Sequence, residues 1–255
     1  MLALERRNLI LEKLQTEKKV VVSELSQIFN VSEETIRRDL DKISKDGFAV
    51  KSYGGAFLNE NTNIDLPFNV RKKHNVEAKQ KIAAIIETLI NDGDHIILDA
   101  STTAVFIAKI LKQKKNLTVI TNSVEIIIEL SDMPDWNIIS SGGSLKNGYL
   151  ALFGSQASQT FTSYNTDTLI LSCKGISMDK GITDVNDTFS QVKQAMIKSA
   201  KTKILAVNYS KFDEVAFSKV GDVNLADIIV TDRKPSAEWL AFFETNRIKC
   251  IYAEL

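Results

Sequence analysis

The sequence predicts an α/β protein in which a small N-terminal domain precedes a larger domain built on a mainly parallel sheet. The first 57 residues contain three short helical patterns and then a strand-and-turn segment. After residue 75, helical patterns alternate with runs rich in β-branched residues. This alternation is typical of a Rossmann-like sheet covered by helices on both faces. The runs are 95–99, 117–121, 137–140, 168–172, 204–208, 227–231 and 249–253.

Composition and charge narrow the class of protein. Hydrophobic residues are 44% of the 255 residues and charged residues 25%, which is typical of a folded protein with a sizeable core. The 32 basic and 32 acidic residues cancel, so a nucleic-acid surface would have to be local. No apolar run reaches the ~20 residues of a membrane span, and the charged N-terminus is not a signal peptide. Cys173 and Cys250 lack paired spacing, so we predict a cytoplasmic protein without a disulfide or a metal site.

Two helical patterns and a short strand lie before residue 31. Apolar residues at helical spacing predict a helix over 4–16. Residues 18–23, KKVVVS, favour a short strand because they contain a run of β-branched valines. Ser23 is the expected N-cap of a second helix, and Asn30 suits the turn that ends it.

The stretch VSEETIRRDLDKISKD, residues 31–46, predicts a third helix. Ser32 is its expected N-cap, and Glu33 and Glu34 follow where the positive end of the helix dipole favours acids. Helical geometry gathers the apolar side chains on one side and turns polar ones to the other. The polar side holds Thr35, Arg38, Asp41 and Lys42, with Arg37 on the flank. This charged side could face only water, or it could present its arginines to a negatively charged partner.

The neighbouring segments favour the second alternative. A short helix and a turn precede the third helix, and FAVKSYGGAF, residues 48–57, predicts a strand and a glycine turn. Three short helices and a β-wing describe a winged helix-turn-helix domain, whose third helix enters the major groove of double-stranded DNA. Because an arginine fork can engage guanine or phosphate with two hydrogen bonds, Arg38 is expected at base edges or at an adjacent phosphate.

These residues resemble the signature of the DeoR family of bacterial transcriptional regulators. Members show a T-I-R-R-D-L core, then a glycine, a basic residue and H-G-G-A. The chain has Lys51 where arginine is usual and Tyr53 where histidine is usual. It keeps Thr35, Ile36, Arg37, Arg38, Asp39, Leu40, Gly47, Gly54, Gly55 and Ala56.

The charged residues of the third helix and the wing have different expected roles. Arg37, Lys42 and Lys51 are expected to position DNA phosphates. Asp39 lies beside the apolar side of the helix, so we expect it to be a structural hydrogen-bond acceptor. The predicted DNA-binding residues are Ser32, Thr35, Arg37, Arg38, Lys42, Lys51 and Tyr53.

A polar, Asn-rich stretch over residues 58–66, LNENTNIDL, precedes Pro67 and is typical of a hinge. We therefore predict a DNA-binding domain over 1–57, a linker over 58–74, and a sensor and oligomerisation domain over 75–255.

Polar residues follow several predicted strands of the larger domain. Ligands of parallel sheets bind beyond the carboxyl ends of the strands, and a helix N-terminus there can bind an anion. A phosphate-bearing small ligand is therefore expected. Each hydroxyl could instead be only a helix cap, and Lys211 could be only a solvent-exposed side chain. The loops are 99–103 (DASTT), 121–123 (TNS), 141–144 (SGGS) and 208–211 (NYSK).

These loops also resemble the DeoR-type sensor domain, which is related in fold to ribose-phosphate isomerases and glucosamine-phosphate deaminases. The family pattern D-x-G-T-T appears at residues 99–103, with Ser101 in place of glycine. The D-x-S-K-F pattern appears at residues 208–212, with Asn208 in place of aspartate. The resemblance implies a repressor of a sugar-metabolism operon that responds to a phosphorylated sugar. The implied effector residues are Arg71, Lys79, Asp99, Ser101, Thr102, Thr103, Thr121, Asn122, Gly142, Gly143, Asn208 and Lys211.

Two alternatives remain open. An isomerase-like enzyme would need a carboxylate base, for which Asp99, Asp184 and Asp187 are the candidates, whereas Asn208 cannot take a proton. The histidines, His74 and His95, are expected to be structural or surface residues, and no catalytic residue is predicted. No strand precedes a G-x-G-x-x-G motif, so no nicotinamide or other cofactor is expected.

The second alternative is a DNA-binding protein whose larger domain only oligomerises. Helix-turn-helix proteins usually bind repeated half-sites as symmetric dimers, so a homo-oligomer, dimer or tetramer, is expected in either case. In the sensor interpretation, ligand binding would change how the hinge near Pro67 sets the two DNA-binding domains.

Overall fold

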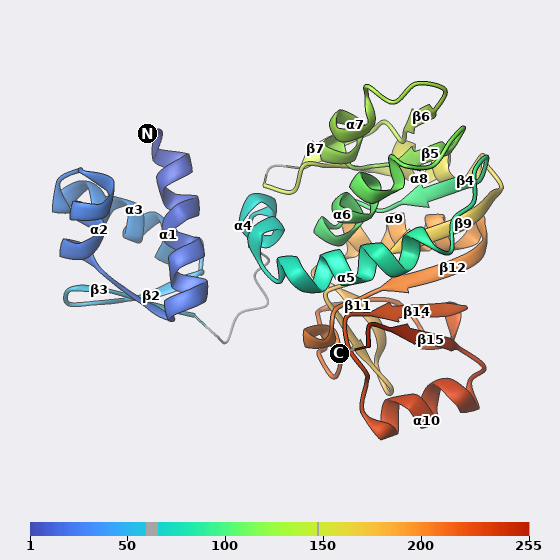
Figure 1. Cartoon of the computed structure of the whole chain (residues 1–255). Helices are drawn as coiled ribbons and strands as arrows, with labels where there is room; N and C mark the ends of the chain where they lie inside the picture. The colour runs from blue at the N-terminus through green and yellow to red at the C-terminus, as the bar shows by residue number, and fades with distance from the viewer. Residues whose placement is uncertain (60–65, 147, 255) are drawn as a thin grey trace. The chain divides into compact units, whose positions relative to one another are not determined.

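The computed structural model describes residues 1–59, 66–146 and 148–254 (Figure 1). By their internal contacts these residues form two compact units, Met1–His74 and Asn75–Leu255, and each is described by itself below. In the residues described, no helix combines the length and the apolar character needed to cross a membrane.

The first 58 residues of the N-terminal unit hold the three helices, the short strand and the wing that the sequence predicts, and the strands pair as a three-stranded antiparallel sheet. Helices α1 (Ala3–Glu17), α2 (Val22–Phe29) and α3 (Glu33–Lys45) precede the hairpin of β2 (Ala49–Ser52) and β3 (Gly55–Leu58). Strand β1 (Lys19–Val21) pairs with β3, which gives the order β1-β3-β2. The buried apolar side of α3, which includes Ile36 and Leu40, packs in one cluster with residues of α1 and α2.

The start of α2 differs from the prediction. The sequence suggested Ser23 as its N-cap, but the helix begins at Val22 and has no side-chain cap. The N–H of Val22 instead donates to the carbonyl of Gly54 at 2.8 Å. A backbone acceptor from the wing thus replaces the predicted serine cap. At the other end of α2, Asn30 has a φ of 50°, the left-handed conformation expected of the turn.

The segment predicted as a linker contains a helix, α4 (Phe68–Lys73). Its Val70 is buried in the same apolar cluster as α1 and α3, and the Lys73 ammonium lies 3.0 Å from Glu12 of α1. The part of the predicted hinge over 60–65 lies outside the described residues. Residues 68–73 therefore pack with the N-terminal unit.

The larger unit is built on a seven-stranded parallel sheet in the order β15-β14-β12-β9-β4-β5-β6. Every predicted strand is found. Their bounds are β4 (His95–Leu98), β5 (Thr118–Thr121), β6 (Asn137–Ser140), β9 (Thr166–Leu171), β12 (Ala200–Ala206), β14 (Ile228–Thr231) and β15 (Lys249–Tyr252).

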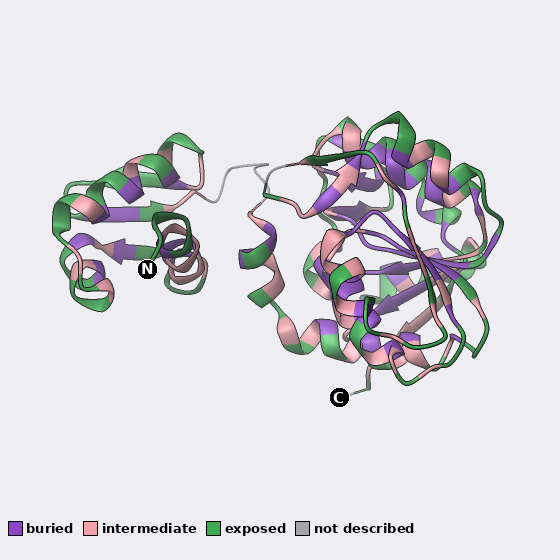
Figure 2. Ribbon diagram, turned by 90° about the horizontal axis from the view of Figure 1, so that it is seen from above, coloured by how far each residue is buried: buried purple, intermediate pink, exposed green. Residues whose placement is uncertain are grey.

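Helices cover both faces of this sheet. Helices α5 (Val76–Glu87), α6 (Thr102–Leu111) and α7 (Val124–Leu130) pack side by side in sequence order (Figure 1). Helices α8 (Ser155–Thr162), α9 (Asp187–Lys198) and α10 (Ala237–Thr245) contribute to another apolar cluster with the sheet. Consecutive residues of the central strands are therefore buried on both faces, as Figure 2 shows by the purple strands.

Two small antiparallel sheets were not predicted. One pairs β7 (Ser144–Lys146) with β8 (Ala151–Phe153). The other has the order β10-β11-β13, from β10 (Gly175–Ser177), β11 (Gly181–Asp184) and β13 (Ser218–Gly221). Short 3₁₀ turns, η1 (Tyr209–Lys211) and η2 (Val223–Leu225), lie in the connections after β12 and β13. These strands of three or four residues are too short to show a clear alternation in the sequence.

Candidate nucleic-acid interface and ligand site

Helix α3 begins with the predicted cap. The Ser32 hydroxyl accepts a hydrogen bond from the Thr35 N–H at 3.2 Å, and the two hydroxyls lie 2.9 Å apart. Gly47, with a φ of 82°, follows the last residues of the helix. The cap fixes where the helix starts, and the helical period then decides which side chains point away from the core.

Arg37 and Arg38 are exposed, and each forms an ion pair with a glutamate one turn earlier. The Arg37 Nη2 lies 2.7 Å from Glu33, and the Arg38 Nε lies 3.1 Å from Glu34. The arginine side chains are 53% and 77% exposed, respectively. Neither guanidinium is tucked into the fold, and exposed pairs of this kind exchange readily with other partners.

The remaining predicted cations of this surface are paired as well. The Lys42 ammonium lies 2.9 Å from Asp46, and Lys51 of the wing donates to Asp41. This hydrogen bond from Lys51 lowers the pKa of Asp41. Tyr53 lies at the turn of the wing and is fully exposed. The predicted DNA-binding residues therefore lie on α3 and the wing of one unit, with acids interleaved among the cations.

Asp39 has the structural role that the sequence suggests. It is buried on the core side of α3, and its Oδ2 accepts from the Arg6 Nε at 2.5 Å. The sequence analysis missed Arg6, which is also buried and lies four residues before Ile10 on the apolar side of α1. A basic residue on an apolar helix face was the signal in the sequence that could have revealed this pair.

The polar loops of the larger unit meet at one edge, because the carboxyl ends of parallel strands lie together. Asp99 follows β4 and is 1% exposed. Its Oδ1 accepts from the Ser101 N–H at 3.1 Å, and its Oδ2 accepts from the N–H of Ser172, after β9, at 2.9 Å. The carboxylate thus joins two neighbouring strand ends.

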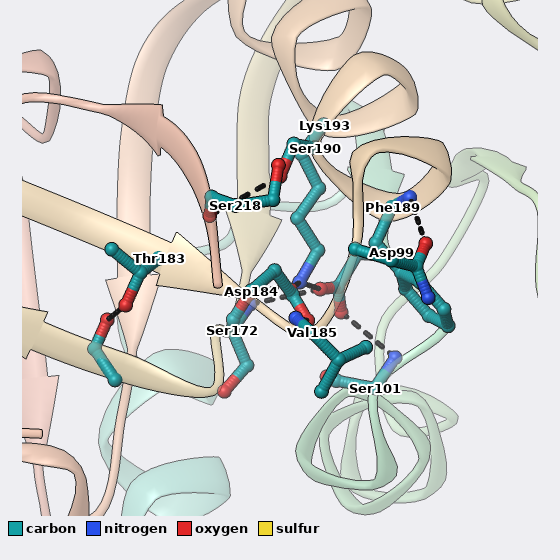
Figure 3. A network of polar contacts seen from close by, with 12 residues as sticks. Asp99, Ser101, Ser172, Thr183, Asp184, Val185, Phe189, Ser190, Lys193 and Ser218 are labelled. Atoms are coloured by element: carbon teal, nitrogen blue, oxygen red, sulfur yellow. Dashed lines mark hydrogen bonds and ion pairs between the residues drawn. The ribbon is translucent and has the colours of Figure 1, made fainter. Parts of the chain in front are cut away.

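Lys193 of α9 points into this edge and was not singled out by the sequence analysis. Figure 3 shows its side chain reaching between Asp99 and Asp184. Its Nζ donates to Asp184 Oδ2 and to the Ser172 carbonyl, both at 2.5 Å, and lies 3.4 Å from Asp99. Burial opposes the charged form, but Asp184 and Asp99 outweigh it and raise the pKa of Lys193 above its ordinary value. The ammonium is therefore charged at neutral pH.

A signal for Lys193 was present in the sequence. Lys193 lies four residues after Phe189 and three before Met196, and these two apolar residues are buried on the inner side of α9. A lysine at that spacing lies on the apolar face, where a charge needs buried partners. Those partners, Asp99 and Asp184, come from distant segments, so only the fold brings them together.

The loops after β4 and β5 contain side-chain hydroxyl and amide groups that cap helices or are buried. Ser101 caps α6 by accepting from Ala104 N–H at 3.0 Å, and Thr102 and Thr103 are buried in the first turn. Thr121 Oγ1 accepts from the Ser123 N–H at 3.0 Å.

Asn122 stands out among these loop residues. Its Nδ2 donates to the Leu152 carbonyl at 3.0 Å. Its Oδ1 is buried and has no hydrogen-bond partner in the described part of the chain. Since a buried acceptor is costly to leave unpaired, this oxygen is a candidate to receive a ligand donor.

Gly142 and Gly143 have a local reason to be glycine. Their φ values are 63° and 103°, in the left-handed region. A Cβ on Gly143 would lie 2.3 Å from the Phe153 carbonyl, and one on Gly142 would lie 3.0 Å from Gln156 Nε2. The close approach of the Gly142 and Gly143 backbone is therefore to β8 and α8.

The other predicted effector residues lie in different places. Asn208 follows β12, is buried, and accepts from the Ser210 hydroxyl at 3.2 Å, while Lys211 ends η1. Lys79 of α5 is 5% exposed, with its Nζ 5.7 Å from the centre of the Phe106 ring. Arg71 belongs to α4 in the N-terminal unit, where its Nε donates to the Leu66 carbonyl at 2.9 Å.

The carboxylates considered as catalytic bases are engaged by protein groups. Asp184 is buried against Lys193, and its Oδ1 accepts from the Val185 N–H at 2.9 Å. Asp187 accepts from the Ser218 hydroxyl at 2.7 Å.

Other residues with catalytic or metal-binding side chains are also accounted for. His95 is exposed, with Nδ1 3.3 Å from Asp167. Burial raises the pKa of the Cys173 thiol to about 12. In the described ranges, no group of three or more metal-ligating side chains comes together.

Comparison with protein families matches both units. A model described as the DeoR-like helix-turn-helix domain matches residues 6–62, and one described as the DeoR C terminal sensor domain matches residues 74–233. Among solved structures, the chain is similar to ribose 5-phosphate isomerase A from Methanocaldococcus jannaschii. The two are 15% identical, with 54% of this chain and 55% of that chain covered and a TM-score of 0.39. A score this low supports no conclusion about function.

Curated relatives match along nearly the whole chain. The uncharacterized HTH-type transcriptional regulator YulB of Bacillus subtilis is 36% identical, covering 98% of this chain and 96% of the relative. The HTH-type transcriptional repressor GlcR of the same organism is 32% identical at the same two coverages, 98% and 96%. The glycerol-3-phosphate regulon repressor of Escherichia coli is 28% identical, covering 96% and 97%. This chain belongs to the DeoR family of transcriptional regulators.

Proposed function

We propose that this protein is a sequence-specific DNA-binding repressor of a sugar-metabolism operon, and that a phosphorylated sugar modulates its affinity for operator DNA. The observation that carries the DNA-binding part is the exposure of Arg37 and Arg38 on a capped helix. Their side chains point away from the buried side of α3, where Ile36 and Leu40 lie. The printed names of GlcR and of the glycerol-3-phosphate regulon repressor support the assignment as a repressor.

The wing and α3 together form the proposed DNA surface. Arg38 contacts a base edge or an adjacent phosphate, and Arg37, Lys42 and Lys51 contact phosphates. Ser32, Thr35 and Tyr53 complete the surface. The protein binds repeated half-sites as a homodimer or a higher homo-oligomer, because a single weakly basic DNA-binding domain gives little affinity by itself.

The strand-end loops form the proposed effector site. Thr102 and Thr103 present hydroxyls and backbone N–H groups at the start of α6, which favours a phosphate group. The Oδ1 of Asn122 lies just after the neighbouring strand β5 and has no partner among the described residues, so it can accept a hydrogen bond from a sugar hydroxyl. Lys79, Asn208 and Lys211 are the further candidates for contact with this ligand.

We propose a sensor rather than an isomerase. Asp99 and Asp184, two of the candidate bases, both face the charged Lys193, and backbone N–H groups occupy their other oxygens. Both oxygens of each carboxylate are therefore already engaged by protein groups. Incubation of the protein with hexose and pentose phosphates is expected to give no isomerised or deaminated product, and formation of such a product would overturn this part of the proposal.

DNA and effector binding can be tested with the full-length protein. Fluorescence anisotropy with a duplex from upstream of its own gene is expected to show salt-dependent, sequence-selective binding. Thermal shift against a panel of sugar phosphates, with the matching free sugars as controls, is expected to identify a ligand that stabilises only in its phosphorylated form. Adding that ligand to the complex should then change DNA affinity. Equal affinity with and without it would contradict the sensor role, and no stabilisation by any sugar phosphate would favour a purely oligomerising domain.

A further inference from the structure

The two arginines of α3 use different atoms in their ion pairs. Arg37 donates from Nη2 to Glu33, whereas Arg38 donates from Nε to Glu34. Both pairs join residues four apart on one helix, and both are exposed. They therefore form a matched set that differs mainly in which edge of the guanidinium is occupied.

This difference matters for reading a base. An end-on contact to guanine uses the two terminal N–H groups of the guanidinium, which donate to O6 and N7. Because Glu34 engages Nε, neither Nη group of Arg38 has a hydrogen-bond acceptor in the residues that the structure describes. In Arg37 the ion pair occupies Nη2, so one of the terminal groups is already engaged.

We propose that Glu34 is a positioning residue that holds Arg38 ready to read a guanine in each half-site, and that Glu33 has no such role. The inference rests on the proposed DNA-binding function. Arg38 is the more exposed of the two arginines, so its free side chain samples many rotamers, and an ion pair at Nε reduces the entropy lost on binding. The pair lies in the N-terminal half of α3, the part of a recognition helix nearest the base edges.

Removing either glutamate also removes a negative charge from a surface that meets phosphates. The E33A and E34A variants are therefore both expected to bind arbitrary DNA more tightly. They should differ in selectivity, because only Glu34 holds a base-reading group. Because both variants lose the same negative charge, simple electrostatic repulsion would affect them alike. A difference in selectivity between them therefore reports the positioning role of Glu34.

The experiment is selection of binding sites from a library of random duplexes by the full-length protein, followed by sequencing. Wild type and the R38A, E34A, E34Q and E33A variants are compared. The wild type is expected to select a motif with a guanine that R38A no longer requires. E34A should lower the preference for that same guanine by about 3- to 10-fold, whereas E33A should keep it. E34Q should lie between E34A and wild type, since its amide oxygen still accepts from Nε.

Two outcomes would overturn the inference. One is an E34A motif with the wild-type preference for guanine; the other is relaxation by E34A at a position that R38A leaves unchanged. A wild-type protein that selects no motif would contradict the proposed function itself, so the two failures are distinguishable. Exposed ion pairs spaced i to i+4 contribute little to stability, and thermal melting of each variant is expected to match wild type.

Discussion

The ion pairs of α3 and those around Lys193 each join a basic side chain to a carboxylate, but the first are exposed and the second are buried. On α3, Arg37 and Arg38 are more than half exposed, and each pairs with one glutamate on its own helix. Around Lys193, side chains from three separate segments meet in a buried cluster, and the lysine side chain is only 9% exposed. An exposed pair is weak because water competes with it, whereas a buried charge that loses its partners is costly.

The comparison distinguishes exposed ion pairs, which can change partners, from buried ion pairs, which stay fixed in the fold. Arg37 can give up Glu33 for a DNA phosphate at little cost, whereas the Nη groups of Arg38 can meet a base while its Nε keeps Glu34. Lys193 holds the ends of β4 and β9 and the last residue of β11 together, so it defines the edge at which a ligand would bind. We expect substitutions in the buried cluster to change stability, and substitutions on α3 to change DNA binding without changing stability.

The largest effect is expected from Lys193→Met. This variant keeps much of the side-chain volume but leaves Asp99 and Asp184 buried without their cation. Removing one partner of a buried ion pair typically costs about 3–5 kcal/mol. Urea unfolding of the full-length protein, followed by circular dichroism, measures the loss.

The matched control for this substitution is Lys198→Met, at the exposed last residue of the same helix. It should change the free energy of unfolding by no more than about 0.5 kcal/mol. If the two variants unfold alike, the Lys193 cluster does not hold the strand ends.

The next largest effect is expected from Arg38→Ala, and it is a loss of free energy of DNA binding. Loss of a bidentate contact should weaken binding to the selected operator by about 1–3 kcal/mol and relax the preference at one base pair. Anisotropy titrations with the operator and with a scrambled duplex measure both quantities. Lys45→Ala removes the same charge from the far end of α3 and should leave the base preference intact. Unchanged operator affinity in a folded R38A protein would contradict the assignment of α3 as the reading helix.

Arg37→Ala is expected to have a smaller and more uniform effect. A phosphate contact carries no sequence information, so operator and scrambled duplex should both lose up to about 1 kcal/mol of binding free energy. The slope of log affinity against log salt should become shallower by about one. A change of base preference in this variant would mean that the roles of the two arginines are reversed.

The same comparison explains how much the sequence could predict. The strands of the large sheet and helices α1, α2 and α3 were predicted, because each has an apolar pattern of its own period. The Ser32 cap and the Asn30 turn were predicted because each depends on one residue type and its immediate neighbours. The exposed arginines of α3 belong to this class, since helical geometry alone turns them outward.

What the sequence did not predict depends on contacts between distant segments. Lys193 meets Asp99 and Asp184 only after the sheet and α9 have assembled, and Arg6 meets Asp39 across 33 residues. Val22 needs no serine cap because the wing supplies a carbonyl. Helix α4 has only six residues, and it is stabilised by Val70 in the core of the N-terminal unit, which its sequence does not reveal.

The smallest effect is expected from Asp41→Asn, which releases Lys51 of the wing. In the folded protein the hydrogen bond from Lys51 holds the pKa of Asp41 below its ordinary value. A lowered pKa contributes stability that is present above the ordinary carboxyl pKa, ~3.9, and is lost as the pH falls through the folded-state value. Since the pair is exposed, the melting temperatures of D41N and wild type should agree at pH 7, and any difference should vanish in acid.

DNA binding gives the sharper test of this last pair. An unpaired Lys51 and one fewer carboxylate should tighten binding to operator and scrambled duplex equally, by roughly twofold to threefold, with a steeper dependence on salt. Asp46→Asn, which releases Lys42 at the end of α3, is the matched comparison. If D41N weakens DNA binding, the acids of this surface support the orientation of Lys51 rather than compete with phosphate. In that case the exposed pairs would be fixed in the way that the buried cluster is.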